Sequence, residues 1–134
     1  MVVGAGISGI LAAKNAAKNN FKTLLVDEKN ELGGSTIYEN NEFNKIDNKA
    51  PSEWLKKEIE ELKNIKNLEI KTRTSVAAYH QYNYLLAREN LTDHLEAKDK
   101  TNKIRQRLLK IRAKKVILAT GALERPLILS LIHI

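Results

Sequence analysis

The chain has 134 residues, of which 43% are apolar and 29% are charged, the proportions of one ordinary globular domain. The absence of cysteine excludes a disulfide scaffold, a cysteine nucleophile and a thiolate metal site, and it favours the cytoplasm. The net charge of +7 comes from lysines scattered among glutamates, so it predicts no nucleic-acid partner. The sequence has no apolar run of bilayer length and no signal-peptide pattern, so it does not indicate a membrane protein.

The first predicted elements are a short strand and a helix, joined by a glycine-rich turn. Val2–Val3 has the apolar character of a buried parallel strand, but it is shorter than such strands usually are. Ile10, Ala13 and Ala17 recur near helical spacing, which predicts a helix over residues 7–19.

The turn, Gly4-Ala5-Gly6-Ile7-Ser8-Gly9, has the spacing Gly-x-Gly-x-x-Gly. We expect Gly4 to permit the tight turn, Gly6 to let a pyrophosphate approach the backbone, and Gly9 to let the helix pack against the sheet. Free N–H groups at Ile7 and Ser8, together with the helix dipole, would then attract the phosphates. The motif alone is weak evidence, so this prediction depends on further signals later in the chain.

A second buried strand is predicted over residues 21–26, and an acidic pair follows it directly. Asp27 stands 18 residues after Gly9, close to the spacing of the acid that binds an adenosine ribose. A carboxylate accepts hydrogen bonds from both ribose hydroxyls and repels a 2′-phosphate, which favours NAD or FAD over NADP. Glu28 is the alternative ribose acid.

Two adjacent glycines come after the acidic pair. Gly33 and Gly34, with Ser35 after them, predict a loop that passes close to the nucleotide, although an ordinary Gly-Gly turn is the alternative. Residues 38–50 are polar and rich in asparagine, which predicts a loop.

The next predicted helix begins at Pro51-Ser52, where proline suits the first turn. Its apolar stripe predicts core packing rather than a cofactor contact. A short strand over residues 68–72 then completes a β-α-β-α-β unit. The stripe consists of Leu55, Ile59 and Leu62, with Trp54 beside it.

After Arg73 the pattern predicts three extended segments, over residues 74–80, 82–95 and 104–113, of which the middle one could contain a helix instead. Alternation of Leu109, Ile111 and Ala113 predicts a half-buried antiparallel strand. Its outer face is expected to be basic, with Arg105, Arg107, Lys110 and Arg112.

A final buried strand is predicted over residues 115–122, returning to the parallel sheet. It ends in Ala119-Thr120-Gly121, whose small side chains would let the backbone lie against the nucleotide or the glycine turn.

The glycine turn, Asp27, Gly33-Gly34 and Ala119-Thr120-Gly121, in this order, resemble the two-dinucleotide-binding-domain flavoprotein superfamily. The fold class that this implies is α/β. It is a Rossmann-like, three-layer FAD/NAD(P)-binding domain with a parallel sheet and an antiparallel β-meander, incomplete in this chain.

A closer resemblance, to the α subunits of heterotetrameric sarcosine oxidases, is carried by several blocks of sequence. These are Val26-Asp27-Glu28, Glu31 to Ser35, Thr72-Arg73-Thr74, Tyr79 to Tyr84, Thr92 to Leu95, Arg105 to Leu108, and Ile111 through Ala119 to Leu127.

The resemblance implies NAD at the glycine-turn site, with FAD in a partner β subunit and covalent FMN at the subunit interface. It also implies γ and δ subunits and a small amine substrate. The complex would demethylate sarcosine oxidatively and pass the one-carbon unit to tetrahydrofolate. It places no catalytic residue in this chain, so we expect the isolated fragment to be inactive.

The resemblance covers residues 1–127, and the sequence at 128–134 matches nothing in that family, so we expect a domain truncated at both ends and an artefactual tail. Two alternatives stay open: an FAD-binding domain of another flavoprotein oxidoreductase, and a non-catalytic nucleotide-binding interaction module. Three histidines are too scattered for metal spacing, so we expect no metal; they are His80, His94 and His133.

Overall fold

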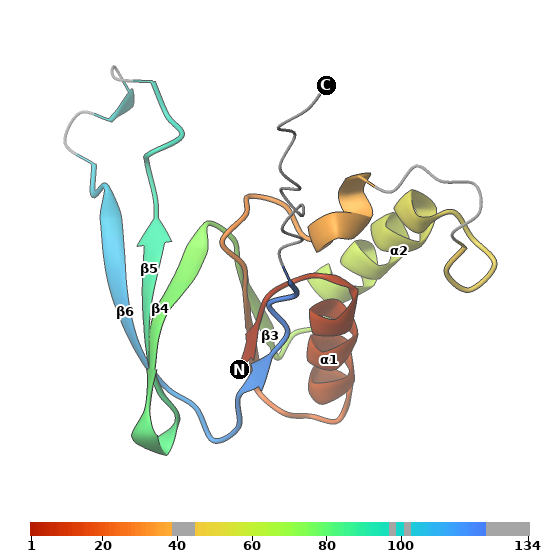
Figure 1. The fold of residues 1–134 in the computed structure, drawn as a ribbon, viewed down its shortest axis with the longest axis horizontal. Helices are drawn as coiled ribbons and strands as arrows, with labels where there is room; N and C mark the ends of the chain where they lie inside the picture. Colours follow the sequence, from red (N-terminus) through yellow and green to blue (C-terminus); the bar gives the residue numbers. More distant parts are fainter. Residues whose placement is uncertain (39–44, 97–98, 101–102, 123–134) are drawn as a thin grey trace, which may run out of the picture.

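The computed structural model describes residues 1–38, 45–96, 99–100 and 103–122 (Figure 1). Strands and helices alternate first, and antiparallel strands come after them. The elements are β1 (Val2–Val3), α1 (Ile7–Lys18), β2 (Thr23–Val26), the 3₁₀ helix η1 (Gly34–Tyr38), α2 (Pro51–Lys63), β3 (Leu68–Lys71), β4 (Thr74–His80), the 3₁₀ turn η2 (Gln81–Asn83), β5 (Tyr84–Asn90), β6 (Gln106–Arg112) and β7 (Ile117–Leu118).

Four strands form a parallel sheet in the order β3-β2-β1-β7. Val2 of β1 pairs with Leu25 of β2 on one side and with Ile117 of β7 on the other. The predicted β-α-β-α-β unit is therefore confirmed, and the last strand returns to the sheet beside the first, as predicted.

Helices α1 and α2 cover one face of this sheet (Figure 1). Ile10 of α1 packs with Leu25 of β2 and with Trp54 and Leu62 of α2 in one buried cluster, so the apolar stripe of α2 is core, as predicted. Helix α1 ends where Asn20 adopts a left-handed conformation, with φ of 62°, which an asparagine tolerates better than most residues.

The antiparallel sheet, in the order β4-β5-β6, lies against the other face (Figure 1). Leu85 of β5 packs with Val3 and Val26 of the parallel sheet, and the half-buried Ile111 of β6 joins them. This gives the predicted three layers: helices, parallel sheet and antiparallel meander. The middle segment, for which the sequence allowed a helix, forms strand β5, preceded by the short turn η2.

Two predicted strands are shorter and more exposed than the sequence indicated. Phe21 lies outside β2 and is 66% exposed, because its N–H bonds to the carbonyl of Ala16 at the end of α1. The prediction that the last strand is buried is wrong, because Ile117 and Leu118 of β7 are 43% and 59% exposed. In the described part of the chain β7 is an edge strand with β1 as its one neighbour, so the sheet covers it from one side. The expected boundary between residues 1–127 and a tail at 128–134 lies outside the described residues.

A charged cluster joins the two helices. The Lys14 ammonium lies 2.6 Å from Glu58 and 2.8 Å from Glu61, and the Glu58 side chain is only 8% exposed. Burial lowers the pKa of Lys14, but the hydrogen bonds and charges of the two glutamates outweigh that effect and raise it above its ordinary value. Lys14 therefore keeps its charge and neutralises a buried carboxylate.

We expect Lys14→Met to lower the free energy of unfolding by about 3 kcal/mol, because it leaves the buried Glu58 carboxylate without its partner. Urea denaturation followed by circular dichroism measures this. Lys18→Met is the matched control: Lys18 is exposed and lies 3.6 Å from Glu61, so its loss costs about 0.5 kcal/mol. Equal losses in the two variants would show that the cluster contributes no more than surface charge.

Candidate functional site

The glycine turn lies where the carboxyl end of β1 meets α1 (Figure 1). Gly4 has a φ of +96°, in the region that favours glycine, and its N–H donates to the carbonyl of Val26 at 2.8 Å. A Cβ on Gly4 would collide with the backbone carbonyl of Ala119, and one on Gly9 would collide with the carbonyl of Gly4. Packing within the protein itself therefore demands glycine at both positions.

Gly6 differs from the other two glycines of the motif. Among the described residues, a Cβ there would meet no heavy atom within 4 Å, and the backbone has an ordinary φ of −69°. Gly6 is the N-cap of α1, with no side-chain cap and no acidic residue in the first helical turn, which begins with Ile7 and Ser8. The N-terminus of this twelve-residue helix thus has no protein cap within the part of the chain that the structure describes, a geometry that suits an anion.

Asp27 holds the glycine turn. Its Oδ2 accepts a hydrogen bond from the N–H of Ala5 at 2.6 Å, and its Oδ1 accepts one from the N–H of Lys29 at 2.8 Å. Each carboxylate oxygen has a further lone pair, so the group can still accept ribose hydroxyls. Glu28, the alternative ribose acid, is exposed, and within the described residues no such contact joins it to the turn.

The Gly33-Gly34 pair lies against the glycine turn. The N–H of Gly33 donates to the carbonyl of Ala5 at 2.7 Å, and a Cβ on Gly34 would lie 3.0 Å from the Cα of Gly6. Both glycines have positive φ, +128° and +60°. The structure therefore brings these two predicted site residues onto the glycine turn, whereas Ser35 lies next to them in η1 and is exposed.

The predicted Ala-Thr-Gly segment reaches the turn through its first two residues. The N–H of Ala119 donates to the carbonyl of Val3 at 2.7 Å, and the Cα of Thr120 lies 3.1 Å from the Cβ position of Gly4. Gly121 has a φ of +70°, and a Cβ there would meet none of the described residues within 4 Å.

A backbone contact between Arg73 and Lys29, close to Asp27, was not predicted from the sequence. Arg73 adopts a φ of 52°, and its N–H donates to the carbonyl of Lys29 at 2.8 Å. The next residue, Thr74, is buried and donates its N–H to the carbonyl of Asp27 at 2.7 Å. The start of β4 is thus joined to the end of β2, and no glycine or proline marked this left-handed turn in the sequence.

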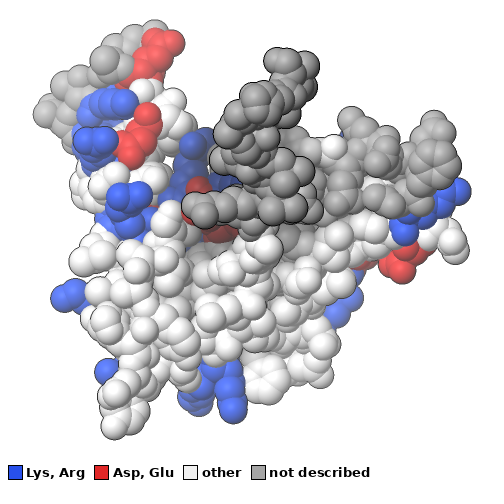
Figure 2. All heavy atoms as spheres, viewed as in Figure 1, with Lys and Arg blue, Asp and Glu red and all other residues white. Residues whose placement is uncertain are grey.

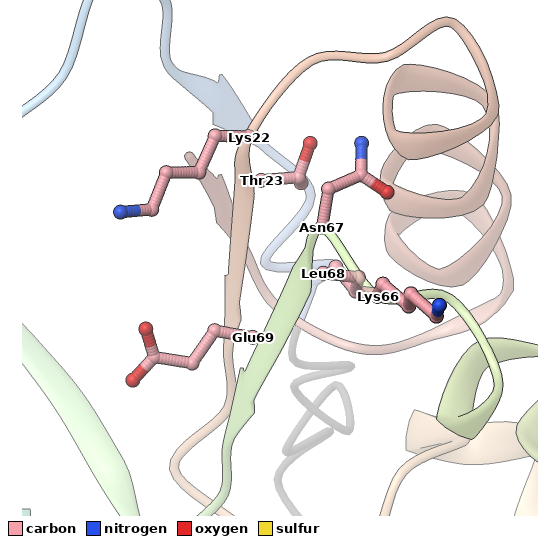
Figure 3. A pocket seen from close by; sticks show the side chains of 6 residues that line it. All are labelled: Lys22, Thr23, Lys66, Asn67, Leu68 and Glu69. Atoms are coloured by element: carbon pink, nitrogen blue, oxygen red, sulfur yellow. The ribbon is translucent and has the colours of Figure 1, made fainter.

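A hollow of about 150 Å³ lies elsewhere, beside the first residues of β2 and β3 (Figure 3). These are the ends of the strands opposite to Asp27. Within it the Asn67 side-chain amide donates to the carbonyls of Ala17 and Phe21, at 2.8 and 3.0 Å, which gives this residue a structural task. The lining residues are Lys22, Thr23, Lys66, Asn67, Leu68 and Glu69.

Other kinds of site are not seen in the described residues. No group of three His, Cys, Asp or Glu side chains there could hold a metal ion. His80 lies beside the Tyr84 ring, with ring centroids 6.1 Å apart, and His94 is exposed, while His133 lies outside the described residues. Within the same ranges, no helix has the length and apolar character that a membrane crossing requires.

A parallel sheet, a glycine turn that opens a helix, and an acid at the end of the second strand define a dinucleotide-binding α/β domain. The profile of the pyridine nucleotide-disulphide oxidoreductase family matches residues 1–132, and the chain belongs to that family.

The chain is 36% identical over 128 residues to sarcosine oxidase subunit alpha from Corynebacterium sp. (strain U-96), and 33% identical over 128 residues to that from Rhizobium meliloti (strain 1021). Each alignment covers 96% of this chain but 13% of the relative, so the chain spans about an eighth of their length. L-proline dehydrogenase from P. horikoshii has a similar structure, with a TM-score of 0.67 and 25% identity, covering 90% of this chain and 22% of that one. The chain is thus a dinucleotide-binding oxidoreductase domain related to sarcosine oxidase α subunits, which confirms the resemblance.

The two kinds of glycine in the motif predict different effects on stability. Gly9→Ala should cost about 3 kcal/mol of unfolding free energy, because its Cβ meets a backbone carbonyl that cannot move away. Gly6→Ala should change stability by less than about 1 kcal/mol, because the space is open and the weaker cap is offset by the smaller entropy of the unfolded chain. Thermal denaturation of both variants tests this, and an equal loss in the two would contradict the geometry.

Proposed function

We propose that this domain holds NAD as the dinucleotide-binding part of the α subunit of a sarcosine oxidase-type complex. The observation that carries the proposal is the backbone at Gly6, which is open among the described residues and lies next to an uncapped helix N-terminus. Gly34 lies so near that a Cβ on it would be 3.0 Å from the Gly6 Cα. This is a cradle that a side chain would fill, and the residues around it fit a pyrophosphate.

In this proposal the adenosine ribose binds to the Asp27 carboxylate, and the pyrophosphate lies over Gly6 against the N–H groups of Ile7, Ser8 and Gly9. Gly34 closes the cradle from the second loop. The backbone of Ala119, Thr120 and Gly121 forms the remaining side. A bound nicotinamide would supply hydride transfer, while the residues of this chain bind and orient the dinucleotide.

The complex in which this happens is also part of the proposal. No catalytic residue is assigned to this chain, and the amine would be oxidised at the flavins of the β subunit and the subunit interface. The γ and δ subunits complete the assembly, in the cytoplasm, with tetrahydrofolate as the acceptor of the one-carbon unit.

FAD is the alternative ligand, because its adenosine and pyrophosphate would meet the same groups. Purification of the full-length subunit without its partners, followed by denaturation and chromatography of the released nucleotide, decides between the two. We expect NAD in amounts approaching one per chain. Stoichiometric FAD without NAD would overturn the proposed ligand and leave the site in place.

The role of Gly6 can be tested without loss of the fold. We expect Gly6→Ala to weaken NAD binding about a hundredfold, because its Cβ occupies the space of the pyrophosphate, while the melting temperature stays close to that of the parent protein. Isothermal titration calorimetry measures the affinity. Unchanged affinity in a folded variant would contradict the proposed pose.

The ribose assignment makes a separate prediction. Asp27→Asn keeps an oxygen that accepts from Ala5 N–H but removes the charge that repels a 2′-phosphate. We expect the preference for NAD over NADP, measured as the ratio of the dissociation constants, to fall about tenfold. Glu28→Gln is the control and should leave the ratio unchanged. The reverse pattern would make Glu28 the ribose acid.

A further inference from the structure

One face of the antiparallel sheet packs against the parallel sheet, and the other face lies outside the core. Leu85, Val76 and Ile111 point inward and pack against the parallel sheet. Because side chains alternate along a strand, their neighbours point outward. We call this surface the outer meander face; it consists of His80, Tyr84, Leu86, Arg88, Leu108, Lys110 and Arg112.

Cross-strand pairing arranges these residues in rows. Arg112 lies opposite Tyr84, Lys110 opposite Leu86, and Leu108 opposite Arg88. The next strand adds His80 opposite Tyr84. Each of these three β5–β6 rows therefore combines one cation with one aromatic or aliphatic side chain.

The charge of this face has one sign. The single acidic residue of β4, β5 and β6, Glu89, points inward, where its carboxylate lies 2.9 Å from Lys71 and 3.5 Å from Arg107. In the described part of the chain no ion pair involves Arg88 or Lys110. Figure 2, in which this sheet forms the left margin, shows Lys and Arg side chains spaced along that margin, with acidic groups at its upper end.

The face also carries anchors of the kind that protein interfaces use. Leu108 is 61% exposed in the middle of β6. The Tyr84 ring is held between its neighbours, with the Arg112 guanidinium 5.8 Å and the His80 ring 6.1 Å from its centroid. Aromatic and arginine side chains with restricted motion are enriched where binding energy concentrates.

We propose that the outer meander face is a docking surface for an acidic patch on another protein subunit, with an apolar contact at Leu108. This rests on the proposed function, since the partner is sought among the β, γ and δ subunits. Unpaired cations with no acid among them select a negatively charged surface. A second copy of the chain would place the same cations against each other, which disfavours self-association. RNA fits less well, because the Arg112 guanidinium already lies over the Tyr84 ring, 5.8 Å from its centroid, where a base would stack.

The test uses the full-length protein co-expressed with the β, γ and δ subunits. We expect the double variant Arg88→Glu/Lys110→Glu to weaken assembly about tenfold, measured as the subunit concentration at which half the complex dissociates in mass photometry. Leu108→Ala should weaken it further. Lys22→Glu/Lys66→Glu, the same charge change at the distant hollow of Figure 3, is the matched control and should leave assembly unchanged.

The outcomes separate this proposal from the proposed function, because bound dinucleotide is measured on the same samples. If the Arg88/Lys110 variant assembles normally, the proposed docking surface is wrong. It is also wrong if the parent protein binds none of the three subunits. Loss of assembly with normal nucleotide content supports it, and the absence of nucleotide overturns only the proposed function. If the parent protein binds a poly(U) probe and the Arg88/Lys110 double variant does not, the face belongs to RNA instead. If the parent protein alone forms a dimer and the double variant is a monomer, the face belongs to a second copy of the chain.

Discussion

The site depends on the backbone N–H and C=O of Ala5. Its N–H donates to the Asp27 carboxylate at 2.6 Å, and its carbonyl accepts from Gly33 at 2.7 Å. Ala5 itself is fully buried, and the bond to the Asp27 carboxylate is partly shielded from water, which strengthens it. One residue thereby fixes the glycine turn to the end of the second strand and to the second glycine loop. The cradle above Gly6 exists because these three segments are held together.

The three layers separate the candidate dinucleotide site from the proposed docking surface. The site opens at the carboxyl ends of β1 and β2, while the outer meander face lies behind the antiparallel sheet, on the far side from the helices (Figure 1). Glu89 lies between the parallel sheet and the meander, paired with Lys71 of one and Arg107 of the other. Nucleotide binding and assembly can therefore be perturbed separately.

Much of this architecture could be predicted from the sequence, because its signals are local. The glycine spacing, the apolar run after Thr23 and the alternation around Leu109 each result from the backbone requirements of one element. The exposure of Ile117 and Leu118 could not be predicted in this way, since an apolar run does not reveal whether its strand has neighbours on both sides. The left-handed turn at Arg73 and its bond to Lys29 depend on contacts between β2 and β4, which leave no residue signature. The hydrogen bond from Ala5 gives Asp27 a structural role that the spacing alone did not indicate.

In the proposed function, the first turn of α1, next to Gly34, receives the pyrophosphate of a dinucleotide. The most direct measurement is a titration of the ¹⁵N-labelled protein with NAD, followed by amide resonances. We expect the largest shifts at Gly6, Ile7, Ser8, Gly9 and Gly34, the residues that line the proposed cradle. Shifts confined to residues elsewhere, such as those of the hollow around Asn67, would contradict it.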